Sequence, residues 1–230
     1  MKKQTVVINL SILFFIIFGC FNGGITLINF LYESAGLGFL GQINIALIYG
    51  AYFISNFFAR NFIGFFKEMK MSLFAGALFY AFMMFSGMFT YYCKTYENFE
   101  GYCAKSSVIG LNCLSNFLLG FFGPTLVWNS QYAYIDKIST KAEKKKLFSI
   151  FFAILQFNYI CGNLLNYGFY SFDINNLYYF TTFFILIVLS SFGFLALLPN
   201  VASYDPLLDQ DSILVENNQV LSSSKILLTK

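Results

Sequence analysis

Residues 120–170 read GFFGPTLVWNSQYAYI, then DKISTKAEKKK, then LFSIFFAILQFNYICGNLLNYGFY. Two apolar segments that contain uncharged polar residues are thus joined by a lysine-rich connection. The ranges 118–134 and 147–172 contain no charged residue. At about 1.5 Å per residue, each is long enough to cross a hydrocarbon core roughly 30 Å thick. The pattern predicts two membrane helices joined by a cytoplasmic loop.

The whole chain has the composition of a membrane protein. Of its 230 residues, 58% are hydrophobic, 21% are aromatic and 11% are charged, whereas soluble domains carry about 25% charged residues. A soluble protein of this size could not bury nearly all of 32 Phe and 16 Tyr side chains. The formal net charge of +3 is too small to indicate a nucleic-acid partner. The composition therefore predicts an all-α polytopic membrane protein that is surrounded by the lipid bilayer.

Six apolar segments, separated by polar turns and loops, predict six transmembrane helices. Their expected positions are about residues 6–32, 39–58, 71–92, 107–134, 147–172 and 177–198. The first segment is too long for a signal-peptide core and lacks a small-residue cleavage pattern, so we expect it to be retained. Pro124 is placed to kink the fourth helix. Residues 1–5 would be a short N-terminus, and the polar residues 199–230 a flexible tail.

The basic residues predict the orientation of the chain. Lys94 and Lys105 fall on one set of alternate loops, and the other 12 of the 14 Lys and Arg residues fall on the opposite side. These 12 are Lys2, Lys3, Arg60, Lys67, Lys70, Lys137, Lys141, Lys144, Lys145, Lys146, Lys225 and Lys230. Because the cytoplasmic side carries the excess of Lys and Arg, we expect both termini and the 136–146 loop to be cytoplasmic. The membrane could be the plasma membrane or an endomembrane.

Cysteine and histidine usage limits the chemistry of the chain. Cys93 and Cys103 are the two of five cysteines that lie outside the apolar segments, one at each end of a loop. They could form a disulfide if that loop faces an oxidising compartment, but the spacing alone leaves free thiols equally open. The chain contains no His, which argues against a zinc site and against a Ser-His or Cys-His catalytic pair. We therefore expect no enzymatic activity, no metal and no cofactor.

Uncharged polar residues inside the apolar segments are the candidate functional positions. No charged residue lies within a predicted span, which argues against proton coupling. The candidates are Asn22, Trp128, Gln131, Tyr134, Gln156 and Asn163. Their spacing gives the fourth and fifth helices a polar stripe each, and one stripe could face the other. The stripes could be interhelical hydrogen bonds worth roughly 0.6–2 kcal/mol each, or the wall of a cavity that meets a substrate or partner.

Several short pieces, taken in order, resemble the amino-terminal half of the Unc-93-like family, a branch of the major facilitator superfamily. The resemblance covers roughly residues 9–198. Its pieces are Asn9-Leu10, the 36–38 turn followed by 46–50, Lys70-Met71-Ser72, Trp128 with Gln131 and Tyr134, and Phe152, Gln156 and Gly162-Asn163. The resemblance implies a twelve-helix fold of two six-helix halves. Members of the family are described as regulators of potassium channels or as trafficking chaperones for membrane receptors.

The sequence departs from the family pattern in two places. The 67–70 connection lacks the glycine that the family places before Lys70, and it lacks the acidic-basic signature of general facilitator transporters. The chain also stops where the family's long cytoplasmic linker would begin, so we expect a homodimer or pairing with a missing second half. The expected function is regulation or chaperoning of a partner channel or receptor. The alternative is a solute carrier half whose cavity is lined by Asn22, Gln131, Gln156 and Asn163.

Overall fold

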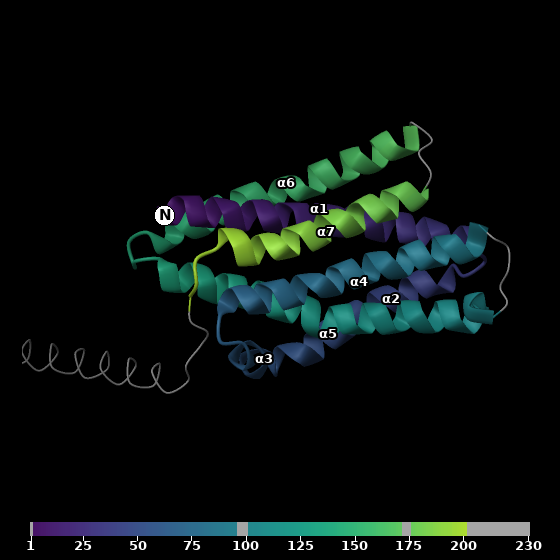
Figure 1. Cartoon of the computed structure of the whole chain (residues 1–230), viewed down its shortest axis with the longest axis horizontal. Coiled ribbons are helices and arrows are strands. Elements are labelled where there is room, and N and C mark those ends of the chain that lie inside the picture. The colour runs from purple at the N-terminus through teal and green to yellow at the C-terminus, as the bar shows by residue number, and fades with distance from the viewer. Residues whose placement is uncertain (1, 96–100, 172–175, 202–230) are drawn as a thin grey trace, which may run out of the picture.

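The computed structural model describes residues 2–95, 101–171 and 176–201, and within these ranges the regular structure is entirely helical (Figure 1). Long helices lie side by side in a bundle, and the connections lie at its two ends. In chain order the elements are α1 (Lys3–Ser34), α2 (Phe39–Asn56), α3 (Ala59–Phe65), α4 (Met69–Thr95), the 3-10 helix η1 (Gly101–Cys103), α5 (Lys105–Ile138), α6 (Lys144–Ser171) and α7 (Asn176–Leu197).

Five of the described helices are long and apolar enough to cross a membrane. They are α1, α4, α5 and α7 over their full lengths and α6 over Lys144–Gly168. The chain is therefore an all-helical protein with the composition and helix lengths of a membrane protein. The 18-residue α2 is not among the five, and it contains the amides Gln42, Asn44 and Asn56.

The helix boundaries differ from the sequence predictions by a few residues, except in the connection after α2. The predicted second span reaches residue 58, but α2 ends at Asn56 and the separate short helix α3 follows. Nothing in the sequence pattern predicts α3. Pro124 lies inside α5, which continues on both sides of it. The predicted tail lies outside the described residues from position 202 onward.

A tight turn at the end of α1 reverses the chain into α2. Gly36 adopts a left-handed conformation with φ of 69°. The backbone N–H of Leu37 donates to the carbonyl oxygen of Tyr32 over 2.8 Å, which closes the end of the helix. The short connection 35–38 fixes where α2 starts relative to α1.

Two pairs of parallel helices approach each other closely at glycines. α1 packs along α6, and α2 packs along α5, with each pair running in the same direction (Figure 1). A Cβ atom on Gly120 of α5 would overlap the backbone of Ile48, and one on Gly162 of α6 would lie 2.9 Å from the carbonyl oxygen of Gly19. Small residues at these crossings let the two backbones touch, as is typical of membrane helices.

An aromatic cluster fills the centre of the bundle. Phe14 of α1 lies 5.5 Å from Trp128 of α5, 5.1 Å from Phe151 of α6 and 5.8 Å from Phe194 of α7, measured between ring centroids. Phe18 approaches Trp128 to 4.8 Å. Most of these rings meet edge to face, the geometry that aromatic pairs favour. The cluster connects α1 to three other helices and leaves little room for polar groups between them.

Candidate functional site

Four buried polar side chains from four helices form one hydrogen-bonded group, here called the four-helix network. Tyr32 of α1 donates its hydroxyl to Oδ1 of Asn112 of α5 over 2.6 Å. Asn44 of α2 donates Nδ2 to the Tyr32 hydroxyl over 2.9 Å, and Asn112 donates Nδ2 to Oγ1 of Thr90 of α4 over 2.7 Å. None of the four side chains is more than 4% exposed. The network therefore ties α1, α2 and α4 to α5.

Buried hydroxyl pairs add further polar links between α5 and its neighbours. They are Ser115 with Ser86 at 2.9 Å, Ser130 with Ser72 at 2.7 Å, and Ser55 with Thr125. Thr90 and Ser86 also donate to carbonyl oxygens one turn earlier in α4, so these hydroxyls act as donors and acceptors at once. Polar groups in such a bundle must find protein partners, because hydrocarbon offers none. α5 is the helix on which these interior bonds converge.

Four buried amide atoms are left without a hydrogen-bond partner in the described part of the chain. They are Oδ1 of Asn44, Oδ1 of Asn116, Nε2 of Gln131 and Oδ1 of Asn166. The NH₂ group of Asn44 is used by the four-helix network, and that of Asn116 donates to the carbonyl of Asn112. A buried polar atom without a partner is costly, typically by about 1–3 kcal/mol. These are interior positions at which a water molecule or polar ligand could still be bound.

The polar stripe predicted on the fourth helix is largely buried. Gln131 and Tyr134 of α5 are 2% and 0% exposed, and Trp128 is half-buried against the aromatic cluster. The Tyr134 hydroxyl donates to the carbonyl oxygen of Pro199 over 3.0 Å. Trp128 thus contributes to packing, and Tyr134 holds the chain at the end of α7. Gln131 is the one of the three that has a buried amide nitrogen without a hydrogen-bond partner.

The polar residues predicted on the fifth helix lie on a different side of the bundle. Gln156 and Asn163 of α6 are exposed and have no hydrogen-bond partner among the described residues. Their stripe does not face that of α5, because α6 packs on α1 and only marginally on α5. The backbone contact between Gly162 and Gly19 sets the side that α6 turns toward α1.

Other amides of α6 make the contact with α1. Asn22, which was predicted as a candidate, donates Nδ2 to Oδ1 of Asn158 over 2.7 Å. Asn166 donates Nδ2 to the carbonyl oxygen of Gly23 over 3.2 Å. α6 therefore carries two sets of amides, one that bonds to α1 and one that faces outward. The six predicted residues do not assemble into a single cavity.

Sequence reasoning missed most of the four-helix network. Asn44 stood out as a polar residue in an apolar segment, but nothing linked it to Tyr32, Thr90 or Asn112. One local signal was present, because Asn112 and Asn116 are four residues apart and therefore share a face of α5. Tyr32 lies near the end of its segment, where tyrosine is ordinarily explained by the membrane interface.

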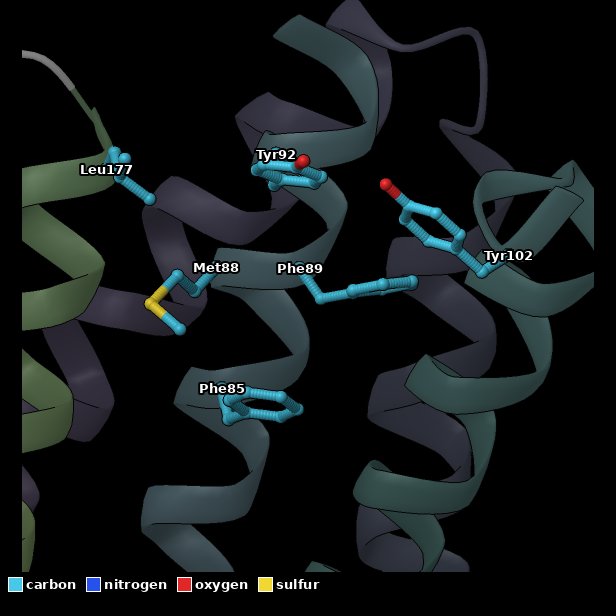
Figure 2. A pocket seen from close by; sticks show the side chains of 6 residues that line it. All are labelled: Phe85, Met88, Phe89, Tyr92, Tyr102 and Leu177. Carbon is cyan, nitrogen blue, oxygen red and sulfur yellow. The ribbon is translucent and has the colours of Figure 1, made fainter. Parts of the chain in front are cut away.

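A disulfide and an apolar groove mark the end of the bundle where α4 meets α5. Cys93 and Cys103 are joined by a disulfide, with Cα atoms 5.3 Å apart. Beside it lies a groove of about 350 Å³ along the face of α4, and Figure 2 shows the side chains that line it. It is lined by Phe85, Met88, Phe89, Tyr92, Tyr102 and Leu177. This lining suits apolar groups such as lipid chains.

An ion pair and side-chain hydrogen bonds hold the opposite end. Lys3 pairs with Glu143 at 2.9 Å, and Thr140 donates to the same carboxylate over 2.9 Å. The hydrogen bond from Lys3, followed by that from Thr140, lowers the pKa of Glu143 below its ordinary value. After α7, Asn200 donates to Glu68 over 2.8 Å. The start of α1 is thus tied to the α5–α6 connection, and the end of α7 to the start of α4.

The described residues interact through hydrogen bonds and apolar packing inside the bundle and through ion pairs at its surface. Among them, no group of three or more His, Cys, Asp or Glu side chains could hold a metal ion. No protein-family model matches this chain, and no curated protein matches its sequence. A function must therefore be inferred from the geometry of the chain itself.

Proposed function

We propose that this chain is a membrane-embedded interaction module that regulates or chaperones a partner membrane protein, such as a potassium channel or a receptor. It has no enzymatic activity of its own. In this proposal its six longest helices cross the membrane as one half of a major-facilitator-type fold of the Unc-93-like kind. Both termini face the cytoplasm of a multi-pass protein in the plasma membrane or an endomembrane.

The pairing of the helices supports the facilitator-type fold. The helix pairs with the most extensive packing are α4–α5, α4–α7, α1–α6, α2–α5 and α1–α7. If α1 and α5 trade places in this set, and likewise α2 with α6 and α4 with α7, the same five helix pairs are obtained. Such a set is what two inverted three-helix repeats produce, and nested repeats of this kind build each half of a facilitator.

The same exchange makes α2 equivalent to α6, which supports α2 as the sixth membrane-spanning helix. It relates α2, which packs on α5 at Gly120, to α6, which packs on α1 at Gly162. At about 1.5 Å per residue, the 18 residues of α2 extend over roughly 27 Å, close to the thickness of a hydrocarbon core. The hydrogen bonds of the Asn44 NH₂ group and of the Ser55 hydroxyl to other helices satisfy two of the polar groups that α2 would carry into the membrane.

The location of the amides favours an interaction module over a solute carrier. Asn22, one of the four residues expected to line a carrier cavity, is hydrogen-bonded between α1 and α6. Gln156 and Asn163 instead lie on the exposed side of α6 without partners among the described residues. Lipid chains cannot satisfy these amides, and each costs several kcal/mol if it is left unpaired in hydrocarbon. This outward pair of amides is the observation that carries the proposal, since another protein can satisfy them.

The proposal is tested by changing outward and interior amides separately. The double variant Gln156→Leu/Asn163→Leu should lose co-purified membrane proteins, measured by quantitative mass spectrometry after mild detergent extraction. Gln131→Leu, which changes an interior amide, is the matched control and should retain them. If Gln131→Leu abolishes uptake of a solute while the outward variant has no effect on co-purification, the carrier alternative is correct and the proposal is wrong.

A further inference from the structure

The exposed side of α6 carries a regular stripe of five residues, here called the α6 seam. Its members are Ser149, Phe152, Gln156, Tyr159 and Asn163. They are spaced alternately three and four residues apart, and all five are exposed, Phe152 by 43% and Tyr159 by 56%. An average spacing of 3.5 residues is the repeat with which two helices pack in a left-handed coiled coil. The seam therefore has the spacing of a helix-pairing surface.

The polar members of the seam recur every seven residues. Ser149 donates its hydroxyl to the carbonyl oxygen of Lys145 in its own helix over 2.9 Å, so it needs no outside partner. Gln156 and Asn163 have none among the described residues. Gln156 lies about 18 Å along α6 from its start, and Asn163 about 10 Å further. Gln156 and Asn163 both lie within Lys144–Gly168, the part of α6 that is apolar enough to cross a membrane.

We propose that the α6 seam binds the α6 seam of a second copy of this chain. This inference rests on the proposed interaction function and names the protein that covers α6. The excess of Lys and Arg on one side of the chain directs every copy into the membrane in the same orientation. A two-fold axis between two such copies must run along the membrane normal. The two α6 helices are then parallel, and each residue meets its own counterpart at the same depth.

At a two-fold axis each side chain meets the same side chain of the second copy, and an amide suits this position better than any other uncharged side chain. An amide side chain both donates and accepts, so two Gln156 side chains can bond to each other reciprocally, as can two Asn163 side chains. Ser149 is small and lets the helices approach at the cytoplasmic end. Phe152 and Tyr159 pack between the polar levels. A single polar residue at such a position already specifies register and two-stranded pairing, and the seam has two.

The experiment uses a photo-crosslinking phenylalanine derivative in the full chain, expressed in its own membrane. Introduced at Phe152 or Tyr159, it should give a crosslinked dimer of this chain. The matched control is Phe157, which is 61% exposed but lies on another side of α6. Introduced there, the derivative should give little or no dimer. Equal dimer from Phe157 and from the seam positions would overturn the α6 seam as the contact.

Two amide variants complete the test. Gln156→Leu/Asn163→Leu removes both reciprocal pairs and should weaken dimerisation about tenfold, whereas Gln156→Asn/Asn163→Gln keeps both amides and should retain it. If the seam positions crosslink to a different protein, the seam does not bind a second copy of this chain, but the proposed interaction function still stands. Crosslinking to lipid alone would overturn both.

Discussion

Replacing Asn112 by Leu should destabilise the bundle, because this one side chain joins α5 to two other helices. It accepts from the Tyr32 hydroxyl at 2.6 Å and donates to Thr90 at 2.7 Å. Leu has a similar size and suits a membrane helix, so the substitution chiefly removes hydrogen bonds. The Tyr32 hydroxyl would still accept from Asn44, but its own proton would have no acceptor.

The expected loss is about 2 kcal/mol of unfolding free energy. Two interhelical hydrogen bonds at about 0.6 kcal/mol each set a lower limit near 1 kcal/mol. A buried hydroxyl left without an acceptor costs about 1–3 kcal/mol, which raises the value above that limit. The matched control is Asn129→Leu in the same helix. Asn129 is half-buried and lies 3.5 Å from Asn56, its nearest hydrogen-bond partner on another helix, so its loss should be below about 0.5 kcal/mol.

The assay is reversible unfolding in mixed micelles of increasing SDS content, followed by the fluorescence of Trp128, the single tryptophan, which lies in the aromatic cluster. A double-mutant cycle of Asn112→Leu with Tyr32→Phe should return a coupling energy of about 1 kcal/mol. If Asn112→Leu and Asn129→Leu unfold at the same SDS fraction, or if the coupling is zero, the four-helix network does not hold the bundle together.

Three other outcomes can be measured. Gly120→Ala should destabilise by more than about 2 kcal/mol, because its methyl group would overlap the backbone of α2, whereas Gly110→Ala in the same helix meets open space and should be neutral. Removing the Cys93–Cys103 disulfide by Cys93→Ala should lower stability by up to about 3 kcal/mol, and an unchanged SDS midpoint would contradict this. A cysteine introduced at Ser139 should react with a membrane-impermeant thiol reagent only from the cytoplasmic side, and labelling from outside would refute the proposed orientation.

Hydropathy was enough to find the long helices, because an uninterrupted apolar run has few other uses. It could not predict the rotation of each helix about its axis. Gln156 and Asn158 have the same chemistry and stand two residues apart, yet Asn158 bonds to α1 and Gln156 faces outward. Their difference depends on the close approach of Gly162 to Gly19, which is a contact between segments far apart in the chain.

The four-helix network was hidden for a related reason. Its members come from four separate segments, so no local spacing connects Tyr32 with Asn112. A polar residue in an apolar segment shows that a partner is needed but not which helix supplies it. α3 was missed because Arg60 and Asn61 interrupt the apolar pattern, and because Ile63 is the one buried residue of this short helix.

The convergence of interior hydrogen bonds on α5 has a consequence for how the protein is made. Helices α1, α2 and α4 are synthesised first, so in the proposed six-span arrangement the hydroxyls of Tyr32, Ser55 and Ser72 enter the membrane before their α5 partners exist. Until α5 leaves the ribosome, these hydroxyls lack the interhelical partners that they have in the folded bundle. A chain that ended before residue 105 would leave Tyr32, Ser55 and Ser72 without these partners, and the cost of unpaired polar groups in hydrocarbon should destabilise it.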